Sequence, residues 1–454
     1  MKKFLLFFSD IFALYVSLIV ALLIRYPADF QRQYGLHIYP FSLIFISWLL
    51  VFYIANLYEP KLLRNNVHFY SALFKAIIIA AVISVLFFYL VPLYGITPKT
   101  NLFIFLAIFA GLELVNRSIF NNVLQKGFKK SVLIVGANNQ SLELDLFIKE
   151  NPQLGYKIQS VIDIFSDKLK DIGQTIQEEK IDIIVLSPEA YQVPEIIDIF
   201  YKSLLGVGSW DGALARPGNS VEQKVGFMNL ASFYERLTGM VPLGAINQVW
   251  FLENLNEGNK RAYEIVKRGS DLVFAVIIGL ISFLFYPFIA LLIKATSEGP
   301  IFYKQKRVGQ AGRFFEIIKF RTMNKDAEKD TGAIWASQDD PRITSMGRFM
   351  RKTRIDELPQ LWNILKGEMA FIGPRAERPE FNKQLKTVPF YEERYLIKPG
   401  LSGWAQINFH YGSSVADAAE KLKYDLYYIK NRSFILDLGI ALKTIRIMFQ
   451  RSGK

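Results

Sequence analysis

Four apolar runs near the N-terminus constrain this chain more than any other feature. They lie at about residues 4–24, 38–57, 69–93 and 102–115 of 454. A helix needs about 20 apolar residues to cross a hydrocarbon core, and the first three runs are that long. The first run is too long for a secretory signal and lacks a small-residue cleavage site, so we expect it to stay in place. We predict four transmembrane helices within residues 1–120, in preference to a soluble bundle of four buried helices.

Basic residues set the expected orientation of these helices. Cations gather before the first run, between the second and third, and after the fourth, and they are sparse in the other two loops. Lys and Arg are enriched in cytoplasmic loops, so both ends of the block are predicted to be cytoplasmic. The cations on this side are Lys2, Lys3, Lys61, Arg64, Arg117, Lys126, Lys129 and Lys130.

The chain changes character after the fourth run. Apolar strands are expected at Ser131–Asn139 and Ile181–Glu189, with a helical pattern between them. This alternation predicts a small parallel α/β domain over residues 129–203. A dinucleotide site needs G-x-G-x-x-G after the first strand, and only Gly136 of that pattern is present. The domain is therefore predicted to be a degenerate Rossmann-like unit with a structural or subunit-contact role. Residues 204–262 have few periodic runs and are predicted to be a linker.

A fifth apolar segment occupies Leu272–Ile293 and contains Pro287. Proline removes a backbone donor and bends a helix. Cations lie on both sides of the segment, at Lys267 and Arg268 before it and at Lys294 after it, so both flanks are expected to be cytoplasmic. We predict a re-entrant helix over residues 270–294 that is bent by Pro287. A kinked transmembrane helix is the alternative.

Charge and composition narrow the function. The formal net charge is +13, and all of it falls after residue 259, where 33 basic and 20 acidic residues occur. Such a field suits phosphate-rich small molecules and anionic membrane surfaces, whereas the 51% hydrophobic composition argues against nucleic acid as a partner. The chain has no cysteine and three histidines, so catalysis must rest on other groups.

Two stretches carry candidate site residues. Ile301–Met323 is predicted to be a β-hairpin whose second strand ends in Lys319-Phe320-Arg321; alternation would place both cations on one face, where they could hold a diphosphate. Solvated strand positions are the alternative. Farther on, Asp356-Glu357 stands between cations and an apolar helical run. Acids there can serve as a nucleophile or metal ligands, or simply as favourable acids at a helix N-terminus.

Three later features complete this region. Gly373-Pro374-Arg375 forms a turn that presents an arginine, and the loop Lys398–Asn408 combines a lysine, glycines, Trp404 and Gln406. Residues of these types can hold a nucleotide base, ribose and phosphates. Apolar residues from Ile435 to Phe449 recur at three- and four-residue spacing, which predicts an amphipathic helix. It could lie on the membrane surface or pack against the domain.

These residues carry a family resemblance. From about Lys267 onward the chain resembles the bacterial sugar transferases, the monotopic polyprenyl-phosphate hexose-1-phosphate transferases, and with its N-terminal spans it is similar to their long-form members. The fold implied is a mixed α/β membrane protein whose mainly helical catalytic domain, residues 263–454, includes the re-entrant helix and a β-hairpin. The matching text is KRGSDL, GPIFYKQKRVG, FEIIKFRTM, DPRITSMGRFMRKTRIDELPQLWNILKGEMAFIGPR, ERPEF, KPGLSGWAQIN and KYDLYYIKNRSFILDL.

The resemblance implies an activity. A sugar 1-phosphate would move from a UDP-sugar to undecaprenyl phosphate at the cytoplasmic face of the inner membrane, with release of UMP, as the first step of exopolysaccharide, O-antigen or capsule repeat-unit assembly. Asp356 would attack the phosphate to give a phosphosugar-aspartyl intermediate. Glu357, together with Asp356, would hold Mg²⁺. The expected substrate-binding residues are Lys319, Arg321, Arg351, Arg375, Lys398 and Gln406.

The chain departs from the family pattern at three positions: Tyr286 stands where a serine commonly precedes the helix-breaking proline, Ala376 replaces a proline, and Ser402 replaces a threonine. None removes the acid pair.

The alternatives are a glycosyltransferase that releases UDP, a membrane-anchored sugar-nucleotide dehydratase, and a non-catalytic polysaccharide assembly partner. The chain lacks the Asp-x-Asp motif that metal-dependent glycosyltransferases usually show. It also lacks the intact glycine fingerprint that a dehydratase would need. The spans and the α/β domain also offer surfaces for a homodimer.

Overall fold

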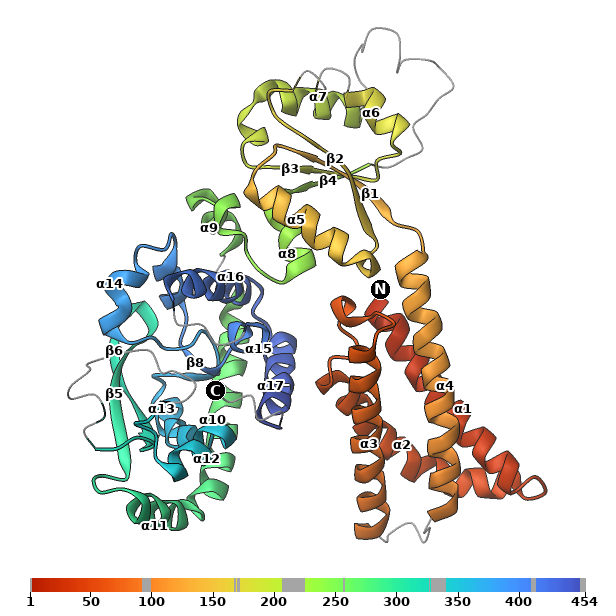
Figure 1. The fold of residues 1–454 in the computed structure, drawn as a ribbon, viewed down its shortest axis with the longest axis vertical. Helices are drawn as coiled ribbons and strands as arrows, with labels where there is room; N and C mark the ends of the chain where they lie inside the picture. The colour runs from red at the N-terminus through yellow and green to blue at the C-terminus, as the bar shows by residue number, and fades with distance from the viewer. Residues whose placement is uncertain are drawn as a thin grey trace. The chain divides into compact units, whose positions relative to one another are not determined.

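The computed structural model describes residues 2–91, 99–166, 169, 172–205, 225–255, 258–325, 327, 340–409 and 414–449. The chain divides into two compact units, residues 1–230 and 231–454. The first contains the predicted spans and the α/β domain, and the second contains the predicted catalytic domain (Figure 1). The predicted fold class, a mixed α/β protein with an apolar helical N-terminus, is confirmed.

Four long apolar helices open the chain. They are α1 (Lys2–Arg25), α2 (Phe30–Ile54), α3 (Val67–Leu90) and α4 (Lys99–Lys126). Each is long and apolar enough to cross a membrane, with mean hydropathy between 1.8 and 2.5 over its best window. The fourth helix runs well beyond its short apolar core. Large apolar side chains such as Phe4, Phe12 and Phe74 point outward, as lipid-facing residues do.

Aromatic rings fill the interior of this helical block. Trp48 packs edge-on against Phe109 at 4.9 Å between ring centroids, and Phe45 stacks on Phe105 at 5.6 Å. The indole N–H of Trp48 donates to the Ser84 hydroxyl at 2.9 Å. The buried donor is thereby satisfied, as an apolar environment requires.

A fully buried ion cluster joins α1, α4 and the segment after α2. The guanidinium of Arg117 on α4 contacts the carboxylates of Asp10 on α1 and Glu113 one turn earlier on α4. It also donates to the carbonyl of Leu57, just after α2, at 2.9 Å. A charge inside a membrane segment is tolerated only with such partners. The cluster explains why Glu113 and Arg117 stand in and after the fourth apolar run.

The α/β domain has one parallel sheet of strand order β2-β1-β3-β4. Its helices lie in Figure 1 on either side of the strands. The strands are β1 (Lys130–Val135), β2 (Tyr156–Ile162), β3 (Ile183–Leu186) and β4 (Gly226–Asn229), and the helices are α5 (Asn139–Glu150), α6 (Ile172–Glu178) and α7 (Pro194–Leu205). β4 pairs with β3, so the domain extends past the predicted boundary at residue 203.

The glycine turn after β1 is built for packing. Gly136 has φ +97°, and a Cβ there would lie 1.8 Å from the Ser187 hydroxyl. The first turn of α5 is capped by its own residues, because the Asn138 side chain accepts from the Ser141 backbone and the Ser141 hydroxyl accepts from the Asn138 backbone. Asn138 also donates to the Glu189 carboxylate at 3.1 Å. A carboxylate there disfavours a phosphate, in line with a structural role for this turn.

The short turn η3 (Pro152–Leu154) docks the α/β domain on the helical block. The Lys2 ammonium donates to the Leu154 carbonyl at 2.9 Å, and Arg64 donates to the Asn151 side chain at 2.8 Å. The Gln153 amide returns a hydrogen bond to the Lys61 carbonyl at 2.8 Å. Two of the cations that set the expected orientation therefore also fix the domain in place.

The second unit combines helices with two small two-stranded sheets. Its helices are α8 (Leu230–Thr238), α9 (Gln248–Asn254), α10 (Arg261–Phe283), α11 (Tyr286–Thr296), α12 (Ser345–Thr353), α13 (Leu361–Lys366), α14 (Asn382–Leu385), α15 (Trp404–Asn408), α16 (Val415–Asn431) and α17 (Phe434–Phe449). Its strands are β5 (Phe302–Val308), β6 (Phe314–Phe320), β7 (Ala370–Ile372) and β8 (Gly400–Ser402). Short 3-10 turns link them, of which η9 (Ile355–Gln360) and η11 (Tyr391–Leu396) carry site residues.

The predicted linker, residues 204–262, differs in the structure. Residues 206–224 lie outside the described residues, but 225–255 are ordered elements. Ala231, Val241 and Trp250 are buried in the main core of the second unit. The Trp404 indole donates to the Gly239 carbonyl at 2.8 Å, and the Lys430 ammonium contacts Glu235 at 2.8 Å. This α8–α9 segment therefore belongs to the C-terminal domain, which begins near residue 231.

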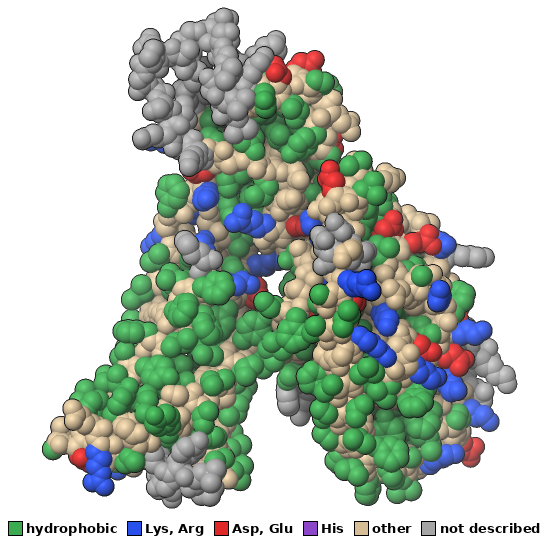
Figure 2. All heavy atoms as spheres, turned by 180° about the vertical axis from the view of Figure 1, so that it is seen from behind, with side chains coloured by type: hydrophobic (Ala, Val, Ile, Leu, Met, Phe, Trp, Pro, Cys, Tyr) green, Lys and Arg blue, Asp and Glu red, His purple; other side chains and the backbone are tan. Residues whose placement is uncertain are grey.

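The fifth apolar segment is broken in the structure. α10 and α11 meet at an angle of 60° with a two-residue gap, and Pro287 is the second residue of α11. The Ser282 hydroxyl donates within α10, to the Gly279 carbonyl at 3.1 Å. Such a bend fits a re-entrant loop or a broken span. Figure 2 shows hydrophobic side chains covering the α11 end of this unit.

The last helix turns its apolar stripe outward. Ile435 is 82% exposed, and Leu438 is half exposed. The opposite side, with Ile440 and Lys443, is buried against the domain. The apolar pattern that predicted an amphipathic helix thus leaves a hydrophobic face free on α17.

Candidate active site

The acid pair lies at a sharp turn between two helices. α12 ends at Thr353, and Arg354 adopts a left-handed conformation with φ 59°, which redirects the chain into η9. Asp356 and Glu357 occupy the first turn of η9, and each is only 6% exposed. The next helix, α13, anchors this turn by burying Leu361 and Ile364. The apolar run after the acids therefore serves to hold them in place.

Three cations converge on one oxygen of Glu357. Its Oε1 lies 3.2 Å from Lys319 Nζ, 3.2 Å from an Arg375 guanidinium nitrogen and 3.6 Å from an Arg354 nitrogen. Burial alone would raise the pKa of Glu357, but these cations outweigh burial and hold that pKa well below its usual range. Glu357 is therefore ionised at all ordinary pH values.

Asp356 has a different environment from its neighbour. Its Oδ1 is buried and has no hydrogen-bond partner among the described residues. Burial raises the pKa of Asp356 to about 6, against the opposing effect of Lys319 and with a further upward effect of Glu357. The pair thus combines a firmly ionised carboxylate with one whose buried oxygen is unpaired, which is the property a nucleophile or a ligand needs.

The β5–β6 hairpin supplies a lysine and an arginine on one face. Lys319 lies opposite Tyr303 in the antiparallel register, so Arg307, four residues beyond Tyr303, shares its face. Arg307 donates to the Ala376 carbonyl at 3.1 Å, and its Nε is buried without a partner. Burial, together with the charge of nearby Arg375, lowers the pKa of Arg307 to about 10. The sequence analysis did not single out Arg307. Strand alternation along β5 would have placed it on the same face of the hairpin as Lys319.

Lys319 and Arg321 have different partners in the structure. Hairpin pairing continues to Arg321, whose backbone N–H donates to the Ile301 carbonyl at 2.9 Å. The Arg321 guanidinium donates to the Ser297 carbonyl at 2.8 Å and to the Glu298 carbonyl at 2.6 Å, at the end of α11. Arg321 therefore caps the helix that carries Pro287, and its part in holding a diphosphate stays a prediction.

Arg351 lies near the acid pair and also has a protein partner. Its Nε donates to the Thr322 hydroxyl at 2.9 Å, which ties α12 to the segment after β6. It still lowers the pKa of Asp356 through its charge. Its predicted part in binding the substrate phosphates stays a prediction.

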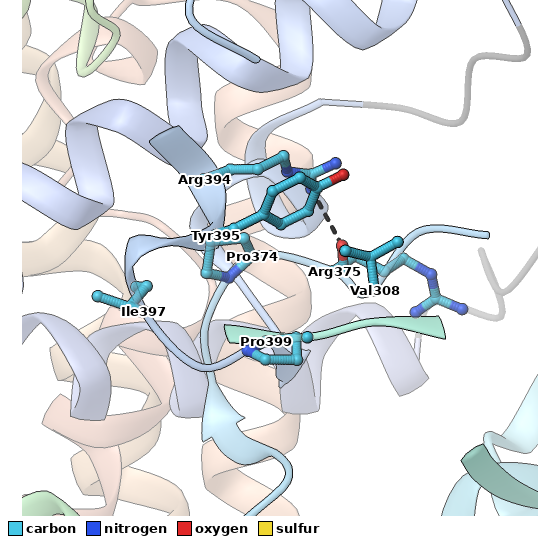
Figure 3. Close-up of a pocket in the computed structure, with 8 residues that line it drawn as sticks. Val308, Pro374, Arg375, Arg394, Tyr395, Ile397 and Pro399 are labelled. Atoms are coloured by element: carbon cyan, nitrogen blue, oxygen red, sulfur yellow. Dashed lines mark hydrogen bonds between the residues drawn. The ribbon is translucent and has the colours of Figure 1, made fainter. Parts of the chain in front are cut away.

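Arg375 projects from a turn that two short parallel strands lock. Gly373 donates to the Ser402 carbonyl and Gly400 to the Pro374 carbonyl, both at 2.8 Å. A Cβ on Gly373 would lie 2.5 Å from the Lys398 carbonyl, so only glycine fits there. Figure 3 shows Pro374, Arg375 and Pro399 around a small pocket beside this turn. The turn at Gly373-Pro374-Arg375 and the loop that begins at Lys398 are therefore held together by the pairing of β7 with β8.

Lys398 and Gln406 lie on the two sides of β8 in the chain. Burial lowers the pKa of Lys398, and the charge of Arg268 has the same effect. The Gln406 amide donates to the Leu401 carbonyl at 3.4 Å within its own loop, and its side-chain oxygen is buried without a partner among the described residues. Trp404 stacks on Tyr427 at 5.6 Å between centroids. Nucleotide binding by the Lys398–Asn408 loop stays a prediction.

The acid pair also offers oxygen atoms to a metal ion. Among the residues that the structure describes, no group of three His, Asp or Glu side chains could hold an ion. Mg²⁺, however, is usually bound by one or two carboxylates together with substrate phosphates and water. The unpaired Oδ1 of Asp356 fits such a ligand, whereas Glu357 Oε1 is already engaged by cations. The residues present therefore fit a Mg²⁺ that arrives with phosphates.

The arrangement as a whole suits an anionic substrate. Lys319, Arg354 and Arg375 touch the acid pair, Arg351 acts on Asp356 at longer range, and the charge of Arg307 acts on Lys319. Five cations around two carboxylates leave a positive excess, and a phosphate can neutralise it. Phosphoryl transfer chiefly needs positioned cations and a positioned nucleophile, and the arrangement offers candidates for both.

Comparison with known proteins identifies the family of this chain. The sequence profile of the bacterial sugar transferases matches residues 262–451. An exopolysaccharide production protein of Rhizobium leguminosarum bv. phaseoli is 36% identical over 187 residues, which are 40% of this chain and 94% of that protein. This chain belongs to the bacterial sugar transferase family.

Two longer relatives are also similar. The UDP-N-acetylgalactosamine-undecaprenyl-phosphate N-acetylgalactosaminephosphotransferase of Aeromonas hydrophila is 40% identical over 248 residues, 54% of this chain and 57% of that protein. The UDP-glucose:undecaprenyl-phosphate glucose-1-phosphate transferase of Klebsiella pneumoniae is 28% identical over 376 residues, 78% of this chain and 76% of that protein. The match to the Aeromonas relative thus spans little more than half of that protein.

Proposed function

We propose that this bacterial sugar transferase moves a sugar 1-phosphate from a UDP-sugar to undecaprenyl phosphate and releases UMP. The observation that carries the proposal is Asp356, with a buried, unpaired oxygen beside Glu357 and its three cations. The names of the Aeromonas and Klebsiella relatives support the same pair of substrates. The name of the Rhizobium relative supports a place in exopolysaccharide production.

The proposed reaction has two displacements at one phosphorus. Asp356 Oδ1 attacks the phosphorus that bears the sugar; an O–P bond forms to the carboxylate, and the bond to the uridine phosphate breaks, releasing UMP. A phosphate oxygen of undecaprenyl phosphate then attacks the same phosphorus and frees Asp356. The attacking phosphate oxygen is already anionic, so this step needs no general base. Lys319, Arg354 and Arg375 neutralise the phosphate charge.

Mg²⁺ forms part of the proposal. Asp356, together with the substrate phosphates, would hold the ion, and Glu357 would contribute through its charge and its hold on Lys319 and Arg375. When bound, the ion would supply charge neutralisation at the phosphates. Removal of Mg²⁺ by a chelator is expected to weaken nucleotide binding as well as turnover.

We also propose that the acceptor is reached from the cytoplasmic face. The bend between α10 and α11 and the cations on both flanks support a re-entrant helix, because each flank would then lie on the same side. The exposed apolar residues of α10 and α11, such as Phe283, Leu284 and Phe288, would lie among lipids. The active-site turn would thus meet a lipid-borne phosphate at the membrane surface.

One assay tests the reaction. Membranes that contain the protein are given undecaprenyl phosphate, Mg²⁺ and a panel of UDP-sugars, and the released nucleotide is identified. UMP release with at least one sugar is expected, whereas UDP release would favour a glycosyltransferase that passes the sugar alone. Asp356→Asn should abolish UMP release and trap no phosphosugar on the protein. Full activity in that variant would overturn the assigned nucleophile.

A further inference from the structure

Arg394 is a buried arginine that lies behind the active-site turn. It belongs to η11 and is only 5% exposed. Its guanidinium donates to the Arg375 carbonyl at 3.0 Å and to the Asp425 carboxylate of α16 at 2.8 Å. It also contacts the Tyr391 hydroxyl and, at 3.5 Å, the Glu377 carboxylate. Figure 3 shows Arg394 reaching across the small pocket to Arg375.

Asp425 fixes the other end of this contact. It lies on the long helix α16 and is buried, and its carboxylate accepts from Arg394. Burial raises the pKa of Asp425 to about 6, and Arg394 acts against this rise. A buried carboxylate of this kind is stable only with a well-placed cation. Arg394 therefore joins a rigid helix to the backbone at Arg375.

The backbone at Arg375 determines how Arg375 reaches Glu357. The Arg375 side chain is 39% exposed, so packing alone does not fix it, yet its guanidinium lies 3.2 Å from Glu357 Oε1. Its backbone is held by the strand pairing at Gly400 on one side and by Arg394 at the carbonyl. A shift of this backbone would move the guanidinium away from Glu357 and from a bound phosphate.

We propose that Arg394, held by Asp425, is a positioning residue that sets the backbone at Arg375 so that the Arg375 guanidinium reaches Glu357 and the substrate phosphate. The inference rests on the proposed phosphosugar transfer. Both terminal nitrogens of Arg394 are engaged by Tyr391, Asp425 and the Arg375 carbonyl, and none of these hydrogen bonds is to the acid pair. Its effect must therefore pass through Arg375.

The chain offers a matched control for this role. Arg432 is also a buried arginine, 4% exposed, that donates to a carboxylate, Glu264 at 2.9 Å, and to a backbone carbonyl, Ile429 at 2.7 Å. These two partners belong to α10 and α16 rather than to the active-site turn. Arg394→Lys and Arg432→Lys should cost similar stability, because each shortens a buried guanidinium with the same kinds of partner.

The test is a double-mutant cycle on UMP release in the full-length protein. Arg394→Lys is expected to lower kcat about ten- to a hundredfold, since small displacements of positioning groups have effects of that order. In an Arg375→Gln background, Arg394→Lys should cause no further loss, because its effect passes through the missing guanidinium. Arg432→Lys should leave kcat near the wild-type value in both backgrounds.

Two results would overturn the inference. One is an Arg394→Lys effect that multiplies with that of Arg375→Gln; the other is an Arg394→Lys variant that matches Arg432→Lys in kcat. If Arg394→Lys does not fold, Asp425→Asn, which keeps the shape of the side chain, takes its place in the same cycle. Absence of UMP release in the wild type with every UDP-sugar would instead refute the proposed function itself.

Discussion

Two adjacent carboxylates in this protein have opposite electrostatic environments. Glu357 faces Lys319, Arg354 and Arg375 through one oxygen, whereas Asp356 keeps a buried oxygen without a partner. Adjacent carboxylates repel, so ionisation of Glu357 makes that of Asp356 harder. Two neighbouring carboxyl groups therefore differ in their pKa, which is the condition under which a pair of acids can take different roles in one site.

The first prediction concerns pH. The pKa of Asp356 is raised to about 6, so its carboxyl group takes up a proton, and loses its nucleophilic form, as the pH falls through that value. We therefore expect kcat for UMP release to fall on the acid side with an apparent pKa near 6. Because the two acids interact, this value belongs to the pair. The measurement is a pH–rate profile from pH 4.5 to 8.

Lys319 provides the control for this assignment. It is the largest charge effect that lowers the pKa of both acids. In Lys319→Met the acid limb of the profile should therefore move to higher pH, and kcat at pH 7.5 should fall by about 10²- to 10³-fold, as for the loss of one preorganised charge partner. A wild-type rate that is flat down to pH 4.5 would contradict the assignment of Asp356.

A second prediction separates two cations that are two residues apart. Arg321→Gln would leave the Ser297 and Glu298 carbonyls without their donor, so it should lower the free energy of unfolding by about 1–3 kcal/mol. Its kcat, measured on folded protein, should stay close to the wild-type value. Lys319→Gln should do the reverse and chiefly reduce kcat. The measurements are thermal unfolding in detergent and UMP release. A strong kcat loss in Arg321→Gln with unchanged stability would restore Arg321 as a substrate contact.

At the scale of elements, the α8–α9 segment is the main addition to the transferase domain. It begins 31 residues before the region that the family profile matches, yet it covers Trp404 and pairs with α16. Gly239 lies close to the Trp404 ring, since a Cβ there would lie 3.3 Å from a ring atom. The segment therefore supports the loop that follows β8.

The third prediction tests this contact with two glycines. Gly239 has φ +71° and faces Trp404, whereas Gly312 has φ +72° and nothing within 4 Å of its missing Cβ. Both Gly→Val changes carry the same backbone strain, of roughly 1–3 kcal/mol. Gly239→Val should therefore lower the unfolding temperature of the second unit more than Gly312→Val. Equal shifts would mean that α8–α9 does not press on Trp404.

The sequence predicted the elements whose pattern is local. The spans followed from hydropathy, the parallel strands from apolar runs between helices, and the acid pair from its motif. The α8–α9 segment was missed because its buried residues, such as Ala231 and Trp250, follow no regular period and are buried by partners far away in sequence. The contacts of the Arg321 guanidinium with Ser297 and Glu298 could not be foreseen, because the end of α11 meets β6 only in the folded domain. Lys398 and Gln406 have suitable chemistry, but only tertiary packing decides where their side chains lie.

For the whole molecule, charge and apolar surface are unevenly distributed along the chain. The formal net charge of +13 falls after residue 259, in the part of the chain that also carries the apolar helices α10 and α11. A positive domain with an exposed hydrophobic end is suited to the cytoplasmic face of an anionic membrane. In this arrangement the acid pair would lie near the surface from which undecaprenyl phosphate presents its head group.

The fourth prediction tests that orientation. A reporter fused after Lys454 should behave as cytoplasmic if α10 and α11 enter and leave on one side. Pro287 favours the break because it lacks the N–H that would bond to the Phe283 carbonyl in a continuous helix. Pro287→Ala should therefore move a measurable fraction of the reporter to the periplasm, since Leu272–Ile293 is long enough to span as one helix. Gly279→Ala, which changes an open position of α10 before the break, should leave the reporter cytoplasmic. A periplasmic reporter in the wild type would refute the re-entrant helix and leave the acid pair on the wrong side of the membrane for a UDP-sugar.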